Sequence, residues 1–130
     1  MDNPHVDNMP DYTEQITIYY NPEINTHRKT VAHAKGGADV LALPFDKMPE
    51  AYNIWMDVWE TIKDNPAQIF DDTHPKYDTL VKNQITNFVD WRKILLHNRD
   101  MIAYPIATSG DRVMIVKRQT QVYDFLEPAR

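Results

Sequence analysis

The chain has 130 residues, of which 42% are hydrophobic and 25% are charged, so its length suits one compact domain with a single core. Its formal net charge of −5 argues against direct nucleic-acid binding, which depends on clustered Lys and Arg. The chain has no cysteine, which excludes disulfides, thiolate metal ligands and every thiol-based mechanism.

The first residues differ in composition from the rest. Residues 1–14 contain two prolines and four acidic residues and have little apolar content, so we expect a flexible leader followed by a single domain over residues 15–130. No apolar run approaches the roughly 18 residues of a membrane span, and the start of the chain does not resemble a signal peptide. We therefore expect no membrane association and a cytoplasmic location.

A strand, a helix and a second strand are predicted next. β-Branched and aromatic residues on both faces predict a strand over Ile16–Tyr20, and helix-compatible residues follow from Asn25 to about Lys35, with a glycine pair as a left-handed stop. A second strand over residues 39–45 completes the βαβ pattern of a parallel pair. Pro44 lacks an N–H donor, so this strand lies at an edge or ends there.

The middle of the chain is predicted to be helical. Ala51, Trp55, Val58 and Ile62 have helical spacing, short turns of helix are predicted near residues 67–70 and 77–81, and a longer helix runs over about residues 85–99. After it, residues 102–108 and 112–116 predict a β-hairpin around a Ser-Gly turn, and residues 119–126 predict a last helix.

The tryptophans allow two interpretations. Trp55, Trp59 and Trp91, with Tyr52 and Met56, lie on helical segments and most simply form a core. Part of this stripe could instead be an exposed apolar patch that contacts a partner or a second copy.

Three stretches of the chain resemble a known family. They are residues 18–28, residues 95–106 and residues 110–126, and they are similar in order and spacing to the glutaredoxin-linked arsenate reductase family, which includes the Spx-type transcriptional regulators. The resemblance implies an α/β, thioredoxin-like fold with a mixed four-stranded sheet. Its elements would be β-α-β, a helical insert at about residues 48–100, a β-hairpin and a C-terminal helix.

The resemblance also identifies a degenerate active-site loop. Its residues are Asn21, Pro22, Ile24, Asn25, Thr26, His27 and Arg28. The family's catalytic cysteine maps onto Ile24, two of its arginines map onto Tyr104 and Lys117, and a third has no counterpart near residues 69–72. Arsenate reduction of this type needs a thiolate and cationic groups around the oxyanion, so we do not expect it here and interpret the chain as a pseudoenzyme.

Several residues of this region have a functional and a structural interpretation. Asn25 or Thr26 is expected to be the N-cap of the first helix. His27, Arg28 and Lys117 could form a small anion site, although a solvated loop histidine is the commoner case.

Two further features of the sequence each allow two interpretations. The resemblance implies a cis peptide bond between Tyr104 and Pro105, the alternative being a trans proline at the start of a strand. Asp71 and Asp72 could act as an acid and base pair, or belong to a solvated loop. The five histidines show no metal-ligand spacing, so no metal is expected.

These observations predict a non-catalytic Spx-like protein that binds a protein partner or a small anion and needs no cofactor. The alternative is an enzyme with altered, cysteine-free chemistry that binds glutathione or an anion through His27, Arg28 and Lys117.

Overall fold

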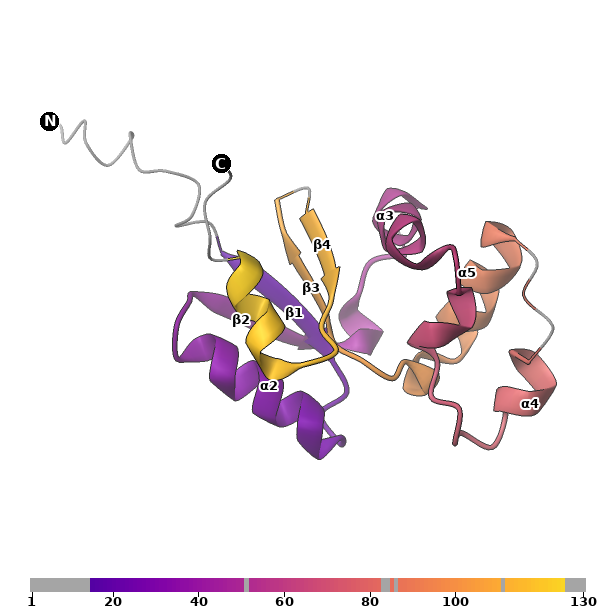
Figure 1. Cartoon of the computed structure of the whole chain (residues 1–130), viewed down its shortest axis with the longest axis horizontal. Coiled ribbons are helices and arrows are strands. Elements are labelled where there is room, and N and C mark those ends of the chain that lie inside the picture. Colours follow the sequence, from indigo (N-terminus) through magenta and orange to yellow (C-terminus); the bar gives the residue numbers. More distant parts are fainter. Residues whose placement is uncertain (1–14, 51, 83–84, 86, 111, 126–130) are drawn as a thin grey trace, which may run out of the picture.

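The computed structural model describes residues 15–125 apart from positions 51, 83, 84, 86 and 111. The leader predicted over residues 1–14 and the predicted helix end at Leu126 lie outside the described residues. Within them a strand, a helix and a strand are followed by a helical segment (residues 52–101), a hairpin and a last short helix (Figure 1).

The sheet has the mixed pairing that the sequence predicts. Its strands are β1 (Ile16–Tyr20), β2 (Val40–Pro44), β3 (Ile106–Ser109) and β4 (Arg112–Ile115), in the spatial order β2-β1-β3-β4. β1 pairs in parallel with β2 and antiparallel with β3, and β3 pairs antiparallel with β4. β2 is therefore an edge strand, where a proline costs no ladder hydrogen bond.

The helices also follow the predicted order. The α-helices are α2 (Asn25–Lys35), α3 (Tyr52–Ile62), α4 (Tyr77–Leu80) and α5 (Phe88–His97). The 3-10 helices are η2 (Phe45–Lys47), η3 (Pro66–Ile69), η4 (Arg99–Met101) and η5 (Gln119–Phe125).

One local expectation was wrong, and one helix differs in type. The predicted left-handed stop of α2 is absent, because Gly36 has a right-handed φ of −70° and its N–H still bonds the last turn of the helix. The last helix lies where it was predicted, as the 3-10 helix η5, which is rich in residues of modest helix propensity such as Thr120, Val122 and Tyr123.

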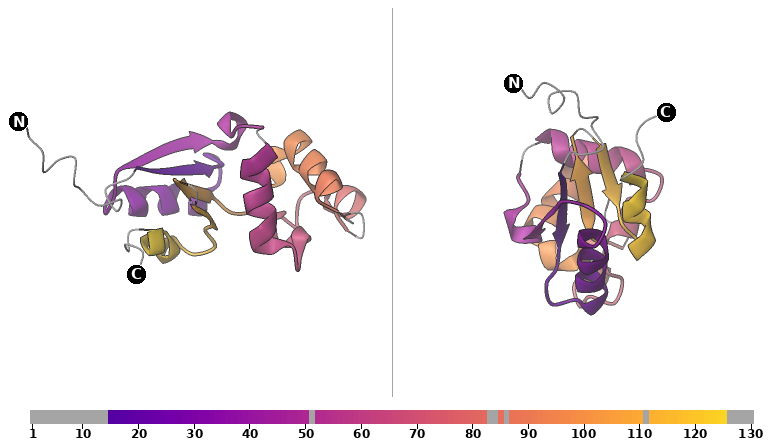
Figure 2. Two further views of the ribbon diagram at one scale, coloured as in Figure 1. Left: turned by 90° about the horizontal axis from the view of Figure 1, so that it is seen from above. Right: turned by 90° about the vertical axis from the view of Figure 1, so that its left-hand side faces the viewer.

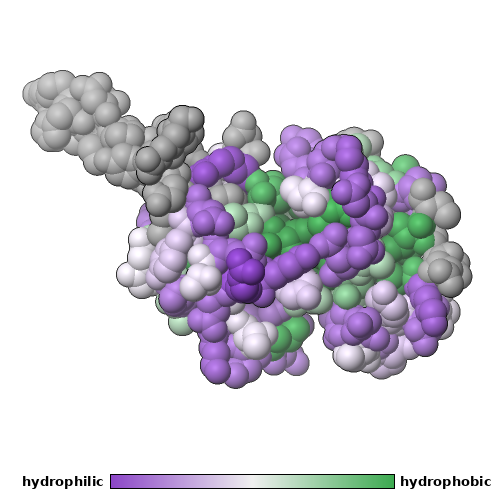
Figure 3. Space-filling model, viewed as in Figure 1, coloured by the Kyte–Doolittle hydropathy of each residue, from purple (hydrophilic) through white to green (hydrophobic). Residues whose placement is uncertain are grey.

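Side chains of β1 alternate between two cores on opposite faces of the sheet. Ile16 and Ile18 pack with Val31 of α2 and Val122 of η5, whereas Tyr19 belongs to the core formed with the helical segment. In Figure 1 and in the left view of Figure 2, α3, α4 and α5 gather at one end of the sheet. In Figure 3 hydrophobic residues are visible between the sheet and α3, where a groove of about 310 Å³ is found.

The tryptophans form the centre of the helical core. Trp55 and Trp91 are fully buried, with ring centroids 6.2 Å apart at an interplanar angle of 72°, and Trp59 packs edge-on against Trp91 at 5.3 Å. The indole N–H groups of Trp55 and Trp91 donate to the carbonyl oxygens of Pro49 and Pro66 at 2.8 and 3.2 Å. The core interpretation of Trp55 and Trp91 is therefore confirmed.

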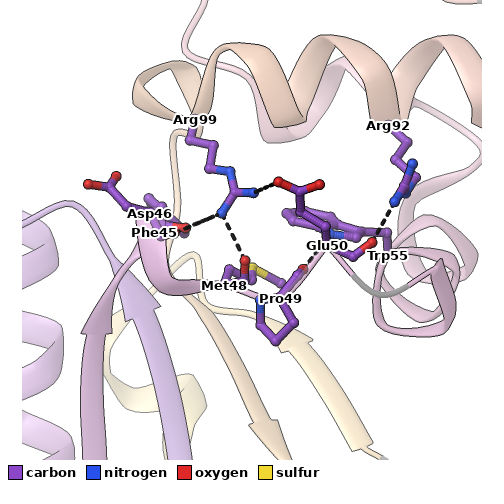
Figure 4. Close-up of polar contacts among 8 residues, drawn as sticks. All are labelled: Phe45, Asp46, Met48, Pro49, Glu50, Trp55, Arg92 and Arg99. Atoms are coloured by element: carbon purple, nitrogen blue, oxygen red, sulfur yellow. Dashed lines mark hydrogen bonds and ion pairs between the residues drawn. The ribbon is translucent and has the colours of Figure 1, made fainter.

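Arg99 attaches the linker between β2 and α3 to the helical segment (Figure 4). Its Nη1 donates to the carbonyl oxygens of Phe45 and Met48, both at 2.8 Å, and more weakly to that of Asp46 at 3.3 Å. Its Nη2 lies 3.6 Å from Oε2 of Glu50, whose carbonyl oxygen accepts a hydrogen bond from Arg92. One guanidinium thus bonds three linker carbonyls, of which that of Phe45 also accepts the N–H of Met48 at 3.0 Å.

Replacing Arg99 by Gln should lower the free energy of unfolding by about 2–4 kcal/mol, because the charge-assisted hydrogen bonds that hold the linker carbonyls of Phe45 and Met48 are lost. Urea denaturation measures the change. The matched control is Lys93→Gln, an exposed position on α5, which should change the free energy by less than about 0.5 kcal/mol. Equal effects of the two variants would contradict this role of Arg99.

Candidate functional site

The loop between β1 and α2 is a compact turn that places Ile24 at the start of α2. The carbonyl oxygen of Asn21 accepts the N–H of Ile24 at 3.0 Å, and the side chain of Asn21 accepts the N–H of Glu23 at 2.9 Å. Ile24 has an extended conformation, and its carbonyl oxygen accepts the N–H of Arg28 at 3.1 Å. Ile24 is therefore the N-cap, and the expectation of Asn25 or Thr26 was wrong because the Asn21 turn starts the helix one residue earlier.

His27 is buried, and both of its ring nitrogens bond to the backbone. Its side chain is 2% exposed, and the N–H of Asn21 donates to Nδ1 at 3.1 Å. Nε2 is therefore the protonated nitrogen, and it donates to the carbonyl oxygen of Ala103 at 2.8 Å. Burial lowers the pKa of His27, although its hydrogen bond to Ala103 acts in the opposite direction. Both ring nitrogens are occupied by the backbone, so none is presented to a ligand.

The other two residues of the predicted anion site also have partners within the protein. The guanidinium of Arg28 turns back onto its own loop and donates to the carbonyl oxygen of Pro22 at 2.7 Å and to Oδ1 of Asn25 at 3.2 Å. Lys117 donates to Oε1 of Gln68, and its Nζ lies 5.9 Å from the ring centroid of Tyr104. The described structure therefore does not bring His27, Arg28 and Lys117 together around an anion.

Ile24 lines an open cleft of about 550 Å³ between the loop and the helical segment. Tyr104 lines the same cleft and does not close it. The lining residues are Ile24, Asn65, Ala67, Gln68, Phe70, Asp71, Asp72, Tyr77, Ala103 and Tyr104. The cleft thus combines apolar, aromatic, amide and carboxylate groups.

Backbone pairing explains why residues distant in sequence line this cleft. Phe70 and Ile102 form an isolated antiparallel bridge, the N–H of Ala103 donates to the carbonyl oxygen of Ile69, and the N–H of Asp71 donates to that of Met101, both at 2.7 Å. Sequence reasoning missed Asn65, Gln68 and Tyr77 as cleft residues. In the sequence, Asp71 and Asp72 were the residues that could have pointed to this wall of the cleft, because they lie near the position where the resemblance implies an arginine.

Asp71 remains ionised in this cleft. Its Oδ1 accepts the N–H and the Oγ1 hydroxyl of Thr73 at 2.9 and 2.7 Å. These hydrogen bonds, the hydroxyl bond first, lower the pKa of Asp71, against a smaller opposing effect of burial. Asp71 is therefore a fixed negative charge and is poorly suited to take up and release a proton near neutral pH.

The predicted cis peptide bond was wrong. The bond between Tyr104 and Pro105 is trans, and no described residue has a cis peptide bond. Pro105 is buried directly before β3, and its carbonyl oxygen accepts the N–H of Val116 at 2.8 Å. The trans isomer is favoured by about 0.5–1 kcal/mol for an X-Pro bond, and it is compatible with the chain entering β3 at this point.

Among residues 15–125 with the gaps given above, no group of three His, Asp or Glu side chains is placed to hold a metal ion. In the same part of the chain, no helix is long and apolar enough to cross a membrane.

Stability should fall in mildly acidic solution because His27 must stay neutral to accept the Asn21 N–H. The folded-state pKa lies below the unfolded value of about 6.5, so the unfolded state binds more protons, and the loss begins near that value and grows as pH falls. His27→Ala should cost about 2–3 kcal/mol at pH 7.5 and should flatten the pH dependence between pH 7 and 5. Thermal unfolding measures both.

The matched control is His97→Ala, at the exposed last turn of α5, which should leave most of the acid sensitivity in place. An unchanged pH profile in His27→Ala would contradict the assignment of His27.

Comparison with solved structures identifies the fold. An arsenate reductase from Vibrio cholerae superposes with a TM-score of 0.71 at 13% identity, covering 86% of this chain and 98% of that one. An arsenate reductase (ArsC) related protein from Brucella melitensis superposes with a TM-score of 0.61 at 15% identity, covering 87% and 95%. No protein-family model matches the sequence, and no curated protein matches it. The chain therefore has the thioredoxin-like fold of ArsC arsenate reductase structures, at low sequence identity and without any cysteine.

Proposed function

We propose that this chain is a non-catalytic thioredoxin-fold protein that acts by binding a protein partner in the cleft beside Ile24. The observation that carries the proposal is the position of Ile24. It is the N-cap of α2, where the resemblance implies a thiolate, and it lines an open cleft whose other walls have no thiol. The binding surface is retained while the reactive atom is absent.

The surroundings of Ile24 argue against a retained reductase. An arsenate oxyanion needs cations around it, and here Asp71 and Asp72 line the cleft instead. Tyr104 stands where the resemblance implies an arginine and carries no charge to offer an oxyanion. The change thus extends beyond one catalytic side chain.

A protein partner is favoured over a small anion by the placement of the cations. Arg28 faces its own loop, Lys117 is held by Gln68, and His27 is buried and neutral. A cleft of about 550 Å³ with apolar, aromatic and amide walls instead suits a side chain or short segment of another protein.

A thermal-shift screen tests the competing anion-binding enzyme. Glutathione, arsenate, phosphate and sulfate should leave the unfolding temperature unchanged, because no cluster of free cations faces the cleft in the described structure. A ligand at 100 times its Kd would stabilise the protein by about 2.7 kcal/mol, which the method detects. Saturable stabilisation by glutathione or arsenate would contradict the proposal.

Selection from a display library of random peptides tests partner binding directly. Peptides that bind the wild-type chain should lose at least about tenfold in affinity for Ile24→Trp, because an indole side chain would fill part of the cleft. Fluorescence polarisation measures the affinities. The matched control is Val89→Trp, at a position on α5 that is 66% exposed, which should bind like the wild type. The proposal fails if no selected peptide distinguishes Ile24→Trp from Val89→Trp.

A further inference from the structure

We infer that the outer edge of β2 pairs with the same edge of a second copy of this chain, so that two four-stranded sheets form one. β2 lies at one end of the strand order β2-β1-β3-β4, and in the left view of Figure 2 it runs along one side of the molecule. Among the described residues, β2 pairs with β1 alone. Its residues do not line the cleft beside Ile24, so this inference goes beyond the proposed function.

The backbone groups of β2 that face away from β1 specify an extended partner. Ile16 is aligned with Val40 in the parallel ladder, and its N–H donates to the carbonyl oxygen of Asp39 at 3.0 Å. Successive residues of a strand direct their N–H and C=O groups to opposite sides, so those of Val40 and Ala42 point to the outer side. Such a row of donors and acceptors is paired by an added strand.

β2 has few of the devices that keep sheet edges apart. Its sequence Val-Leu-Ala-Leu-Pro has no charged residue, none of its residues is buried, and Leu41 is 42% exposed. Pro44 is at the last position, where it leaves the outward N–H groups of Val40 and Ala42 in place. A strand edge with this composition is prone to pair with another strand.

The opposite edge of the sheet is better protected. α3 packs against β4, which begins with the exposed Arg112 and is followed by the exposed Lys117. Charged side chains and a covering helix are the usual means of blocking an edge. The comparison therefore assigns strand pairing to β2 and not to β4.

One antiparallel register satisfies the outward groups of β2 by two-fold symmetry. It is centred on Leu41, so that Val40 of each copy lies opposite Ala42 of the other and each pair exchanges both of its hydrogen bonds. Leu41 then lies opposite its own counterpart in a non-hydrogen-bonded pair, where the side chains approach closely. The exposed leucine is thereby buried, and this self-complementarity favours a second copy over an unrelated strand.

Neighbouring registers satisfy the edge less well. An axis on Val40 would place Leu41 opposite Asp39, which pairs an apolar side chain with a carboxylate. An axis on Ala42 would place Val40 opposite Pro44, which has no N–H to donate. The position of Leu41 at the axis is therefore a specific feature of the inferred dimer.

Sedimentation velocity of the full chain tests the inference. The interface is small, so we expect a weak dimer whose share rises between about 10 µM and about 1 mM protein. Leu41→Lys should stay monomeric, because two ammonium groups would meet at the axis. The matched control is Val89→Lys, at a position on α5 that is 66% exposed, which should dimerise like the wild type.

A mixture of two charged variants tests the position of the axis. Leu41→Lys and Leu41→Glu should each be monomeric alone, whereas their equimolar mixture should contain at least about threefold more dimer, because opposite charges then meet. Only a residue at a two-fold axis lies opposite itself, so an interface elsewhere on the chain would not give this recovery.

The lack of cysteine in the chain allows a direct test of distance. The Cα atoms of a non-hydrogen-bonded antiparallel pair lie about 4.5 Å apart, within the range of about 4.4–6.8 Å that a disulfide spans. With the oxidant diamide, Leu41→Cys should form a covalent dimer at least about tenfold faster than Val89→Cys at the same concentration. Non-reducing gel electrophoresis measures both rates.

A wild-type chain that stays monomeric at about 1 mM overturns the inference. Dimerisation that survives Leu41→Lys, a mixture with no more dimer than its components, or equal crosslinking rates of Leu41→Cys and Val89→Cys would overturn it as well. Circular dichroism checks that each variant is folded, and Leu41→Cys, which keeps a small apolar side chain, decides the question if Leu41→Lys unfolds. Ile24→Trp should dimerise like the wild type, so failure of the dimer and failure of cleft binding are separate results.

Discussion

The two hydrogen bonds of the His27 side chain are the constraint on which the site depends. One ring nitrogen holds the end of β1 through Asn21, and the other holds Ala103, just before β3. Because the ring is buried and neutral, it connects the loop after β1 with the loop before β3, the two central strands, without requiring a counter-ion. Ile24 and Tyr104 thereby come to line the same cleft.

A second constraint sets the other wall of the cleft. Arg99 holds the linker after β2 against the helical segment, and Trp55 and Trp91 form a packed centre within that segment. The cleft lies where this helical part meets the loop of the sheet, so its shape depends on both anchors. Its chemistry is nonetheless set by groups that neither anchor uses, namely the Asp71 and Asp72 carboxylates and the aromatic side chains.

The structure combines a thioredoxin-like fold with a cleft that is lined by two carboxylates and has no thiol. A helix N-terminus beside an open cleft favours anions in general, but here its N-cap is apolar and the facing wall is acidic. The Lys117 ammonium donates to Gln68 and lies 5.9 Å from the ring centroid of Tyr104, and both of these residues line the cleft. The local electrostatics consequently favour a cationic or neutral group over an oxyanion.

The sequence by itself determined the order of elements, the edge position of β2 and the loss of thiol chemistry. Periodicity and the positions of proline and cysteine are local properties, and they can be read without knowing which segments pack against each other. Only the tertiary structure decided the roles of the site residues. His27 bonds a carbonyl 76 positions away, and Lys117 bonds Gln68 at a separation of 49 positions. Such partners depend on how the segments pack, which a local pattern does not reveal. His27 therefore has a buried position between two loops, and the Lys117 ammonium donates to Gln68.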